Sequence, residues 1–284
     1  MAYNARHMPE IPELEAIRDF FAKQLPGKTI RSVTTRIPPV FRTPPQELRE
    51  TLPGDAFGEV MRHGKFLLFP LASGRVLAIN PMLTGRFQFV DSATKLHGRT
   101  CLSVALDDGH DLRYVDERVM GKVYLVALDA LDQIPGWATN GPDLLDPALT
   151  EDVWVQRMRK YRGQVKGILT KAEFVQGIGN AYSDEILWEA RINPYTPKTS
   201  LSEEDVRRLY RAARAVTAWA TPLARQAMIK DGVLDYEERR DFLRVHRRGG
   251  QPCPRCGATI SEITANQRVT SFCRQCQPGG PAMG

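Results

Sequence analysis

The chain has 284 residues and a mass of 31.9 kDa, which predicts roughly two domains of ordinary size. Hydrophobic residues make up 42% and charged residues 25%, so the chain can build packed cores and is not disordered throughout. The mean hydropathy of -0.34, without an apolar run of about 18 residues, excludes a membrane span. No apolar segment near Met1 indicates a secretion signal, and we expect a cytoplasmic protein.

The positive charge of the chain is concentrated near its carboxyl end. In total, 39 Lys and Arg residues stand against 33 Asp and Glu residues, a net charge of +6. Residues 239–276 contain eight arginines and two acidic residues, so this stretch alone accounts for the excess. Guanidinium groups bind phosphate in a bidentate manner. A solvated charged face is the ordinary explanation, but the cysteine motif in the same stretch favours nucleic-acid binding.

Four of the five cysteines form two Cys-x-x-Cys pairs, Cys253 with Cys256 and Cys273 with Cys276. The 16 residues between the pairs are typical of a structural zinc site, in which two tight turns supply four thiolates to one tetrahedral ion. Disulfides or free core thiols fit poorly with a chain that shows no secretion signal. Four thiolates leave no open coordination position, so we expect one structural zinc ion. Cys101 is predicted to be a buried strand residue.

The predicted elements change from strands to helices along the chain. Apolar residues at helical spacing predict a helix over residues 13–25. Short β-rich runs separated by Gly, Pro, Asp and Asn follow, and they predict a β-sandwich or barrel. These runs are residues 30–33, 66–69, 76–79, 87–90, 102–106 and 123–126. After a segment rich in Gly, Pro and Asp, helices are predicted over residues 153–161, 164–172, 181–190 and 203–223.

Two glycines precede the third of these later helices. Gly177 and Gly179 stand in the segment Phe-Val-Gln-Gly-Ile-Gly-Asn, with Asn180 as the expected N-cap. Backbone N–H groups at such a turn converge on an anion, and glycines let the backbone approach a phosphate closely. An ordinary corner between two helices is the alternative, because a Gly-x-Gly pair alone is a weak signal.

Three motifs occur in a set order: Met8-Pro-Glu-Ile-Pro-Glu-Leu-Glu15, the Gly-Ile-Gly-Asn turn and the four-cysteine hairpin. In this combination the sequence resembles the formamidopyrimidine-DNA glycosylase/endonuclease VIII family of base-excision repair enzymes, from Met8 to about Gln277. The resemblance implies an α+β multidomain fold with DNA bound in a cleft between domains. We expect an N-terminal β-sandwich catalytic domain with its N-terminal helix over residues 8–128, a linker over 129–150, a helix-two-turns-helix domain over 151–246 and a zinc-finger β-hairpin over 247–278.

The resemblance also assigns catalytic residues. Pro9 matches the family's N-terminal proline, whose secondary amine attacks C1′ of the damaged nucleotide, expels the base and forms a Schiff base. Glu10 matches the acid/base residue, and Lys65 matches a lysine that contacts the phosphate and supports catalysis. As numbered, Pro9 is internal and its nitrogen is a tertiary amide. Either translation begins at Met8, or residues 1–8 are removed, or the nucleophilic role is lost.

Further residues match positions that hold DNA in the family. Asn180 and Arg268 match an Asn and a zinc-finger Arg that grip the phosphates beside a flipped nucleotide. Lys166 matches another basic position in the cleft, and Gly177 and Gly179 belong to the turn that precedes Asn180.

The residues that would fill the space left by a flipped base depart from the family pattern. Asn80 replaces the family's strand histidine, and Leu83 or Met82 is the candidate wedge. Arg118 is the candidate contact with the orphaned base, while Met120 takes the place of an aromatic residue. Residues 230–235 lack the Gly/Thr-rich loop that grips 8-oxoguanine in the formamidopyrimidine branch, so the sequence does not assign the lesion.

These assignments predict a bifunctional DNA glycosylase and AP lyase, a monomer that acts on damaged DNA and needs no obligate protein partner and no membrane. The alternative is a non-catalytic reader of damaged or abasic DNA with the same fold. A zinc-ribbon module fused to an unrelated β-domain is disfavoured by the order of the motifs. We expect the protein in the cytoplasm, associated with the nucleoid if the source is bacterial.

Overall fold

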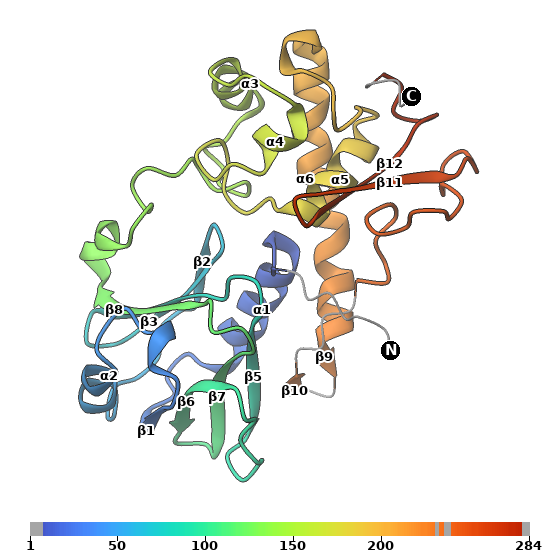
Figure 1. Ribbon diagram of the computed structural model, residues 1–284. Helices are drawn as coiled ribbons and strands as arrows, with labels where there is room; N and C mark the ends of the chain where they lie inside the picture. Colours follow the sequence, from blue (N-terminus) through green and yellow to red (C-terminus); the bar gives the residue numbers. More distant parts are fainter. Residues whose placement is uncertain (1–7, 231–232, 236–239, 280–284) are drawn as a thin grey trace. The chain divides into compact units, whose positions relative to one another are not determined.

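The computed structural model describes residues 8–230, 233–235 and 240–279 (Figure 1). The chain folds into two compact units, one of residues 1–138 and 221–240, the other of residues 139–220 and 241–284. Helix α6 (Glu203–Met228) runs through the boundary at residue 220. The two compact units divide the chain after residues 138, 220 and 240, which differ from the expected segment boundaries. The division into four segments therefore stays a prediction. The extension before Met8 lies outside the described residues.

In the described part of the chain, the first unit is built on two antiparallel sheets. One sheet has the strand order β1-β6-β7-β5-β10-β9 and the other the order β2-β3-β4-β8. Their strands are β1 (Ile30–Thr35), β2 (Met61–His63), β3 (Phe66–Pro70), β4 (Arg75–Asn80), β5 (Gly85–Asp91), β6 (Thr100–Leu106), β7 (His110–Asp116), β8 (Lys122–Ala127), β9 (Ile229–Lys230) and β10 (Val233–Asp235). All six predicted strands are confirmed, and the sandwich with them.

Strand β7 was not predicted, although its polar residues Asp111 and Arg113 alternate with the apolar Leu112 and Tyr114, as in a half-buried strand. Asp111 and Arg113 are both buried in it and pair with each other at 2.8 Å between Nη2 and Oδ2. The hydroxyl groups of Ser92 and Ser103 donate to the same Asp111 carboxylate at 2.7 and 3.0 Å. A charged residue can occupy a core position when its charge is paired and hydrogen-bonded. Sequence alternation does not reveal such pairing.

Helix α1 (Ile11–Gln24) supplies the central aromatic contacts of the first unit. Its Phe21 is fully buried and packs edge-to-face on Phe69 of β3 and on Phe87 and Phe89 of β5, with ring centroids 5.6, 6.1 and 6.3 Å away. Strands β3 and β5 belong to different sheets, so one side chain joins both layers of the core. The short helices of this unit are η1 (Pro38–Val40), α2 (Pro45–Thr51) and η2 (Leu128–Gln133).

The second unit contains the helices and the C-terminal hairpin. Its helices are α3 (Glu151–Arg159), α4 (Val165–Leu169), α5 (Asn180–Glu189), η3 (Lys198–Ser200) and the larger part of α6, and its strands are β11 (Ile260–Ala265) and β12 (Arg268–Cys273). The four predicted helices are confirmed, although α4 is shorter than predicted and α6 is longer. Throughout the described ranges, no helix is both long and apolar enough to cross a membrane.

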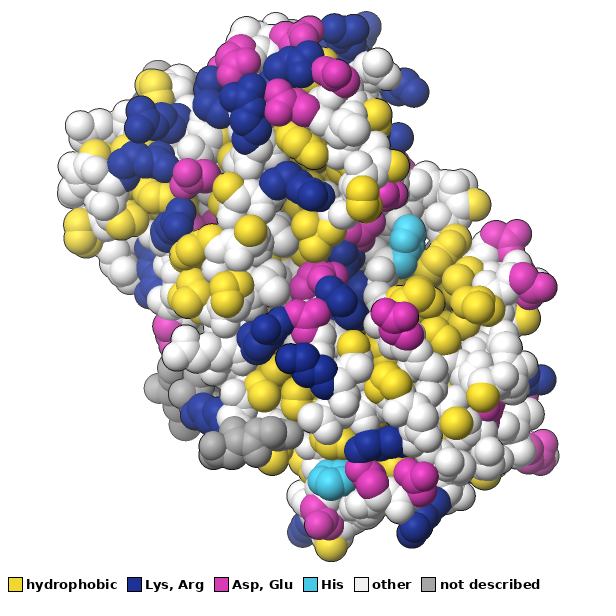
Figure 2. Space-filling model, turned by 180° about the vertical axis from the view of Figure 1, so that it is seen from behind, with side chains coloured by type: hydrophobic (Ala, Val, Ile, Leu, Met, Phe, Trp, Pro, Cys, Tyr) yellow, Lys and Arg dark blue, Asp and Glu magenta, His cyan; other side chains and the backbone are white. Residues whose placement is uncertain are grey.

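Acidic and basic side chains are interleaved where α6 begins, at the top of Figure 2. Arg207 pairs with Asp152 at 2.7 Å and with Glu203 at 2.9 Å, and Arg211 pairs with Glu151 at 3.0 Å. Solvent-exposed pairs of this kind contribute little to stability, because water screens them. Because the charges compensate one another, this surface is a poor match for a phosphate backbone.

We expect Phe21→Ala to lower the free energy of unfolding by roughly 3–5 kcal/mol, because the cavity would lie where both sheets meet. Urea unfolding followed by far-ultraviolet circular dichroism measures the change. Met61→Ala is the control, since this side chain is 38% exposed and its truncation should change stability by about 0.5 kcal/mol or less. Equal effects of the two substitutions would contradict the central role of Phe21.

Candidate active site and zinc centre

The start of helix α1 fixes the position of Glu10. Glu10 is the N-cap, and its carboxylate accepts the backbone N–H of Glu13, while the Glu13 carboxylate accepts the Glu10 N–H at 3.0 Å. This reciprocal capping box satisfies two backbone donors at the helix start. Both carboxylates are 3% exposed, and Pro9 directly before them is also buried. The sequence-predicted catalytic pair therefore lies on a rigid helix terminus.

Arg240 holds this terminus and was not singled out in the sequence. Its Nε donates to Oε1 of Glu13 at 2.8 Å, and its Nη2 donates to the carbonyl oxygen of Met8 at 2.9 Å. Its Nη1 lies 3.8 Å from Oε1 of Glu10. Only the position of Arg240 in a basic stretch pointed to it, because its partners lie more than 220 residues earlier in the chain.

Lys65 lies on the turn between β2 and β3, close to the same terminus. Its Nζ approaches the Met8 sulfur at 3.4 Å. Beside it, Arg62 donates from Nη1 to the carbonyl oxygen of Gly64 at 2.8 Å and pairs through Nε with Glu15 of α1. The structure thus brings together Pro9, Glu10 and Lys65, the three residues expected to be catalytic.

Two loops of the same unit carry the candidate wedge residues. Asn80 ends β4, and its Oδ1 accepts the N–H of Met82 at 3.0 Å. The loop that follows holds Met82 and Leu83, both half-buried. The loop between β7 and β8 holds Arg118 and Met120, both exposed. Met120 is 41% exposed, so its apolar side chain is accessible from solvent.

In the second unit, Lys166 and Asn180 converge on the C-terminal hairpin. Lys166 Nζ donates to the carbonyl oxygen of Val269 at 3.0 Å and to Oγ1 of Thr270 at 2.9 Å. Asn180 Nδ2 donates to the same Val269 carbonyl oxygen at 2.9 Å. The Lys166 ammonium group also pairs with the fully buried carboxylate of Asp184 at 2.7 Å. Lys166 and Asn180 therefore hold β12, the strand that begins at Arg268, by hydrogen bonds to its first residues.

The N-cap of α5 is Gly179 rather than Asn180, which is the first residue of the helix. Gly177 has a φ of 99°, a left-handed conformation that favours glycine. Asn180 directs its amide to the hairpin instead of capping the helix, because the carbonyl oxygen of Val269 is within reach. The expected N-cap assignment was therefore wrong, while the glycine turn before a helix is confirmed.

Arg268 is exposed and stands at the first position of β12. The turn before it contains Asn266 and Gln267, whose φ values of 48° and 62° are typical of a tight hairpin turn with two left-handed residues. Ala265 and Arg268 close this turn as a strand pair. The guanidinium group is thus presented at the tip of the hairpin, in a position to contact a phosphate.

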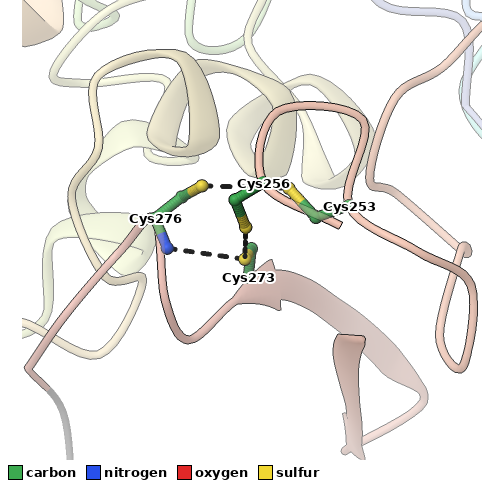
Figure 3. A group of neighbouring side chains, drawn as sticks. All are labelled: Cys253, Cys256, Cys273 and Cys276. Atoms are coloured by element: carbon green, nitrogen blue, oxygen red, sulfur yellow. Dashed lines mark hydrogen bonds between the residues drawn. The ribbon is translucent and has the colours of Figure 1, made fainter. Parts of the chain in front are cut away.

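The four thiols of the cysteine pairs point toward one another (Figure 3). Their sulfur atoms all lie within 4.8 Å of one another, with 3.5 Å between Cys256 and Cys273 and 3.9 Å between Cys253 and Cys276. Zinc–sulfur bonds of about 2.3 Å in a tetrahedron require sulfur separations of about 3.8 Å. The four side chains therefore fit one structural zinc ion.

Trp188 of α5 connects the helices to this centre. Its indole N–H donates to the sulfur of Cys253 at 3.4 Å, and the guanidinium group of Arg255 stacks on its ring, 3.8 Å from the centroid. Glu189 pairs with Arg255 at 3.3 Å and with Arg244 at 3.0 Å. Burial by itself would raise the pKa of Cys253, but hydrogen bonds from the Arg255 backbone and from Trp188 lower it to about 6.

Cys101 lies outside the zinc centre. It is fully buried in β6, as predicted, and burial together with the nearby charge of Asp116 raises the pKa of its thiol to about 12. The thiol therefore stays protonated at neutral pH and is a poor nucleophile.

Family models match three parts of the chain: the formamidopyrimidine-DNA glycosylase N-terminal domain over residues 8–123, the H2TH domain of the same glycosylase over residues 140–229, and a zinc finger found in FPG and IleRS over residues 250–279. A formamidopyrimidine-DNA glycosylase of Pelotomaculum thermopropionicum is 34% identical over 277 residues, 95% of this chain and 99% of that protein. The chain belongs to the formamidopyrimidine-DNA glycosylase family.

Solved structures of the family share the fold. The MutM (Fpg) protein of Thermus thermophilus is 32% identical, with a TM-score of 0.83 over 96% of this chain and 100% of that one. A Lactococcus lactis FPG mutant in complex with DNA containing Fapy-dG is 26% identical, with a TM-score of 0.87 over 95% and 100% of the two chains. This member of the family is accordingly a base-excision-repair DNA glycosylase with AP lyase activity, and a non-catalytic reader is not favoured.

We expect Trp188→Phe to make the glycosylase release zinc roughly fivefold faster to a chromogenic chelator, because the substitution removes the hydrogen bond to the Cys253 sulfur but keeps an aromatic ring. The absorbance of the chelator complex reports the rate. Trp219→Phe is the matched control, since this indole stacks on Arg244 in the same unit. Indistinguishable zinc release rates for the two Trp variants would contradict the role assigned to Trp188.

Cys273→Ser should abolish stoichiometric zinc binding.

Proposed function

We propose that the glycosylase removes damaged bases with Pro9 as its nucleophile, once Pro9 is the amino-terminal residue. The arrangement of Met8, Pro9 and Glu10 carries this proposal. The peptide bond to be lost lies beside Lys65 and Arg240, and the carboxylate of Glu10 is already fixed next to Pro9 by the capping box. The match to the N-terminal family model also begins at residue 8, directly before Pro9.

A free amino-terminal proline supplies the chemistry that an internal one lacks. Its secondary amine has a lone pair that attacks C1′, and the bond from C1′ to the damaged base breaks as the base leaves with the electron pair. The attacking amine gives its proton to the Glu10 carboxylate, and Glu10 passes it to the sugar ring oxygen, so that the C1′–O4′ bond breaks and an iminium forms between Pro9 and C1′. The iminium acidifies the hydrogens at C2′. Loss of one of them as a proton forms the C2′–C3′ double bond and expels the 3′ phosphate by β-elimination.

Arg240 keeps Glu10 in place for this step. Because it binds the Glu13 carboxylate at 2.8 Å, it stabilises the partner that accepts the Glu10 backbone N–H. A catalytic carboxyl group must be held within a fraction of an ångström of its productive position. The proposal therefore includes Arg240 among the residues that position the acid/base group.

Arg268, Lys166, Asn180 and the turn at Gly177 and Gly179 are proposed to hold the DNA backbone. Arg268 is the exposed cation at the hairpin tip, and Lys166 and Asn180 both fix the carbonyl of Val269 beside it. Phosphate contacts of this kind position the duplex without reading its sequence. Asn80, Leu83, Arg118 and Met120 are proposed to occupy the void and contact the orphaned base.

The substrate is proposed to be DNA with an oxidised or otherwise damaged base, or an abasic site. Similar structures hold DNA with Fapy-dG or an abasic site.

The protein is proposed to act as a monomer in the cytoplasm, on the nucleoid if the source is bacterial. Its β-sandwich, linker, helix-two-turns-helix and zinc-finger segments are proposed at residues 8–128, 129–150, 151–246 and 247–278. Residues 231–232 of the segment after α6 lie outside the described part of the chain.

We expect borohydride to link protein that begins at Pro9 covalently to DNA with an abasic site, because only a free amine forms a reducible iminium. The full 284-residue chain should give about 1% of that product or less, since attack by an amide nitrogen is negligible. Denaturing gel electrophoresis of labelled oligonucleotide measures trapping.

Two variants of the chain that begins at Pro9 complete this test. Glu10→Gln should bind lesion DNA nearly as well as wild type but lose roughly 100-fold or more in single-turnover base excision, as expected for a residue that acts in the transition state. Lys65→Ala should still be trapped. Equal trapping of the full chain and the shortened one would reject Pro9 and point to a lysine as nucleophile.

We expect Arg268→Ala to weaken DNA binding by about 1–3 kcal/mol and to make the dependence of log K on log salt shallower by about 0.9, the effect of one lost phosphate contact. Affinities at several salt concentrations measure both quantities. Arg274→Ala is the matched control, because Arg274 is also exposed on the finger but donates to Ser261 Oγ at 3.0 Å. An unchanged salt slope for Arg268→Ala would remove it from the interface.

A further inference from the structure

A buried carboxylate lies between the two loops that carry the candidate wedge residues. Asp116 ends β7 and is 0% exposed. It pairs in the sheet with Gly85, directly after the loop that holds Met82 and Leu83. The loop that holds Arg118 and Met120 begins immediately after it. Asp116 is therefore adjacent in the fold to both loops.

Donors from both loops converge on the Asp116 carboxylate. Oδ1 accepts the hydroxyl of Thr84 at 2.5 Å and the backbone N–H of Arg118 at 3.2 Å. Oδ2 accepts the backbone N–H groups of Met120 and Gly121 at 2.9 and 2.7 Å. Thr84 Oγ1 in turn accepts the N–H of Arg118 at 3.0 Å. The Thr84 side chain is thus the direct bridge between one loop and the other.

Tyr114 fills the space between the same loops. Its hydroxyl group donates to Oδ2 of Asp116 at 3.2 Å. A Cβ added to Gly85 would lie 2.3 Å from that hydroxyl oxygen, and a Cβ added to Gly121 would lie 1.7 Å from it. Gly85, which follows one loop, and Gly121, which ends the other, therefore approach one phenol oxygen so closely that only glycine fits.

Each loop also contains a residue in the left-handed conformation. Met82 has a φ of 50°, and Val119 has a φ of 58°. For a β-branched residue such as Val119 this conformation is strained and persists only where the surroundings enforce it. The hydrogen bonds from Arg118, Met120 and Gly121 to Asp116 flank Val119 on both sides and supply that constraint.

We propose that Asp116, linked through Thr84, is a positioning residue that fixes both wedge loops in one arrangement before DNA is bound. A carboxylate is suited to this role because both of its oxygens accept and neither donates. The five donors named above are neutral groups. Their hydrogen bonds stabilise the buried charge of Asp116, and Asp116 in turn holds the loops in place. This inference rests on the proposed function, since it assigns a purpose to the loops that would enter the void.

The test uses a duplex with a tetrahydrofuran abasic-site analogue opposite 2-aminopurine. The analogue forms no Schiff base, so titration gives an equilibrium affinity, and the fluorescence at saturation reports insertion beside the orphaned base. Thr84→Ala removes the bridging hydroxyl, Thr84→Ser keeps it, and Asp116→Asn replaces one acceptor by a donor. Binding to the undamaged duplex is measured in parallel.

Ser103→Ala provides the matched control. Ser103 donates to Asp111, a second buried carboxylate, which lies near the opposite end of β7 from Asp116. The thermal unfolding midpoint of each variant shows how much stability it loses. A purely structural role of Thr84 would make Thr84→Ala and Ser103→Ala alike in DNA binding.

We expect Thr84→Ala and Asp116→Asn to weaken binding to the tetrahydrofuran duplex roughly tenfold, the effect of one lost hydrogen bond to a charged group. The fluorescence change at saturation should fall, while affinity for undamaged duplex stays within about twofold. Thr84→Ser and Ser103→Ala should resemble wild type. Wild-type binding and fluorescence in Thr84→Ala, or equal losses in Ser103→Ala, would overturn the inference. If wild type itself did not distinguish the two duplexes, the proposed function would fail instead.

Discussion

The structure depends on one constraint: a buried carboxylate must be surrounded by donors. At the start of α1, the Glu13 carboxylate accepts hydrogen bonds from Arg240 and from the Glu10 backbone N–H. The Asp116 carboxylate accepts hydrogen bonds from both wedge loops. In the second unit, Glu185 accepts backbone N–H groups of residues 244–246. Burial raises the pKa of Glu185, and these hydrogen bonds oppose the shift. Each such carboxylate fixes a segment that hydrophobic packing alone would leave loose.

The C-terminal finger follows the same rule. Asp184 accepts the backbone N–H of Ser271 at 3.0 Å and contacts Nδ1 of His246 at 2.7 Å, while it pairs with Lys166. These contacts join α5 to β12, and Trp188 joins α5 to the cysteine cluster. The hairpin is therefore held at both ends, by the zinc ligands at one and by buried polar contacts near the other. A short two-stranded hairpin is marginal alone, so this attachment determines where Arg268 points.

Patterns made of neighbouring residues were predicted well from the sequence. The cysteine spacing predicted the four-cysteine cluster, and period-two and helical patterns predicted six strands and five helices. Strand β7 was not predicted, although Asp111 and Arg113 alternate in it with Leu112 and Tyr114. All four side chains are buried, and the two charged ones pair with each other. The N-cap of α5 was placed one residue late because Asn180 is a good capping residue whose amide instead reaches Val269. At the start of α5, a tertiary partner overrode a local preference.

By itself, the sequence determined the family motifs, the zinc ligands and the candidate catalytic residues, since these are read from residue type and short spacing. Only the tertiary structure decided that Arg240 braces the terminus that carries Pro9 and Glu10, that Lys166 supports the hairpin, and that Thr84 bridges two loops through Asp116. The physical reason is the large separation of these residues along the sequence. These polar contacts join residues 32 to 232 positions apart, and a hydrogen bond depends on a separation of about 3 Å in space, which no local pattern of the chain encodes.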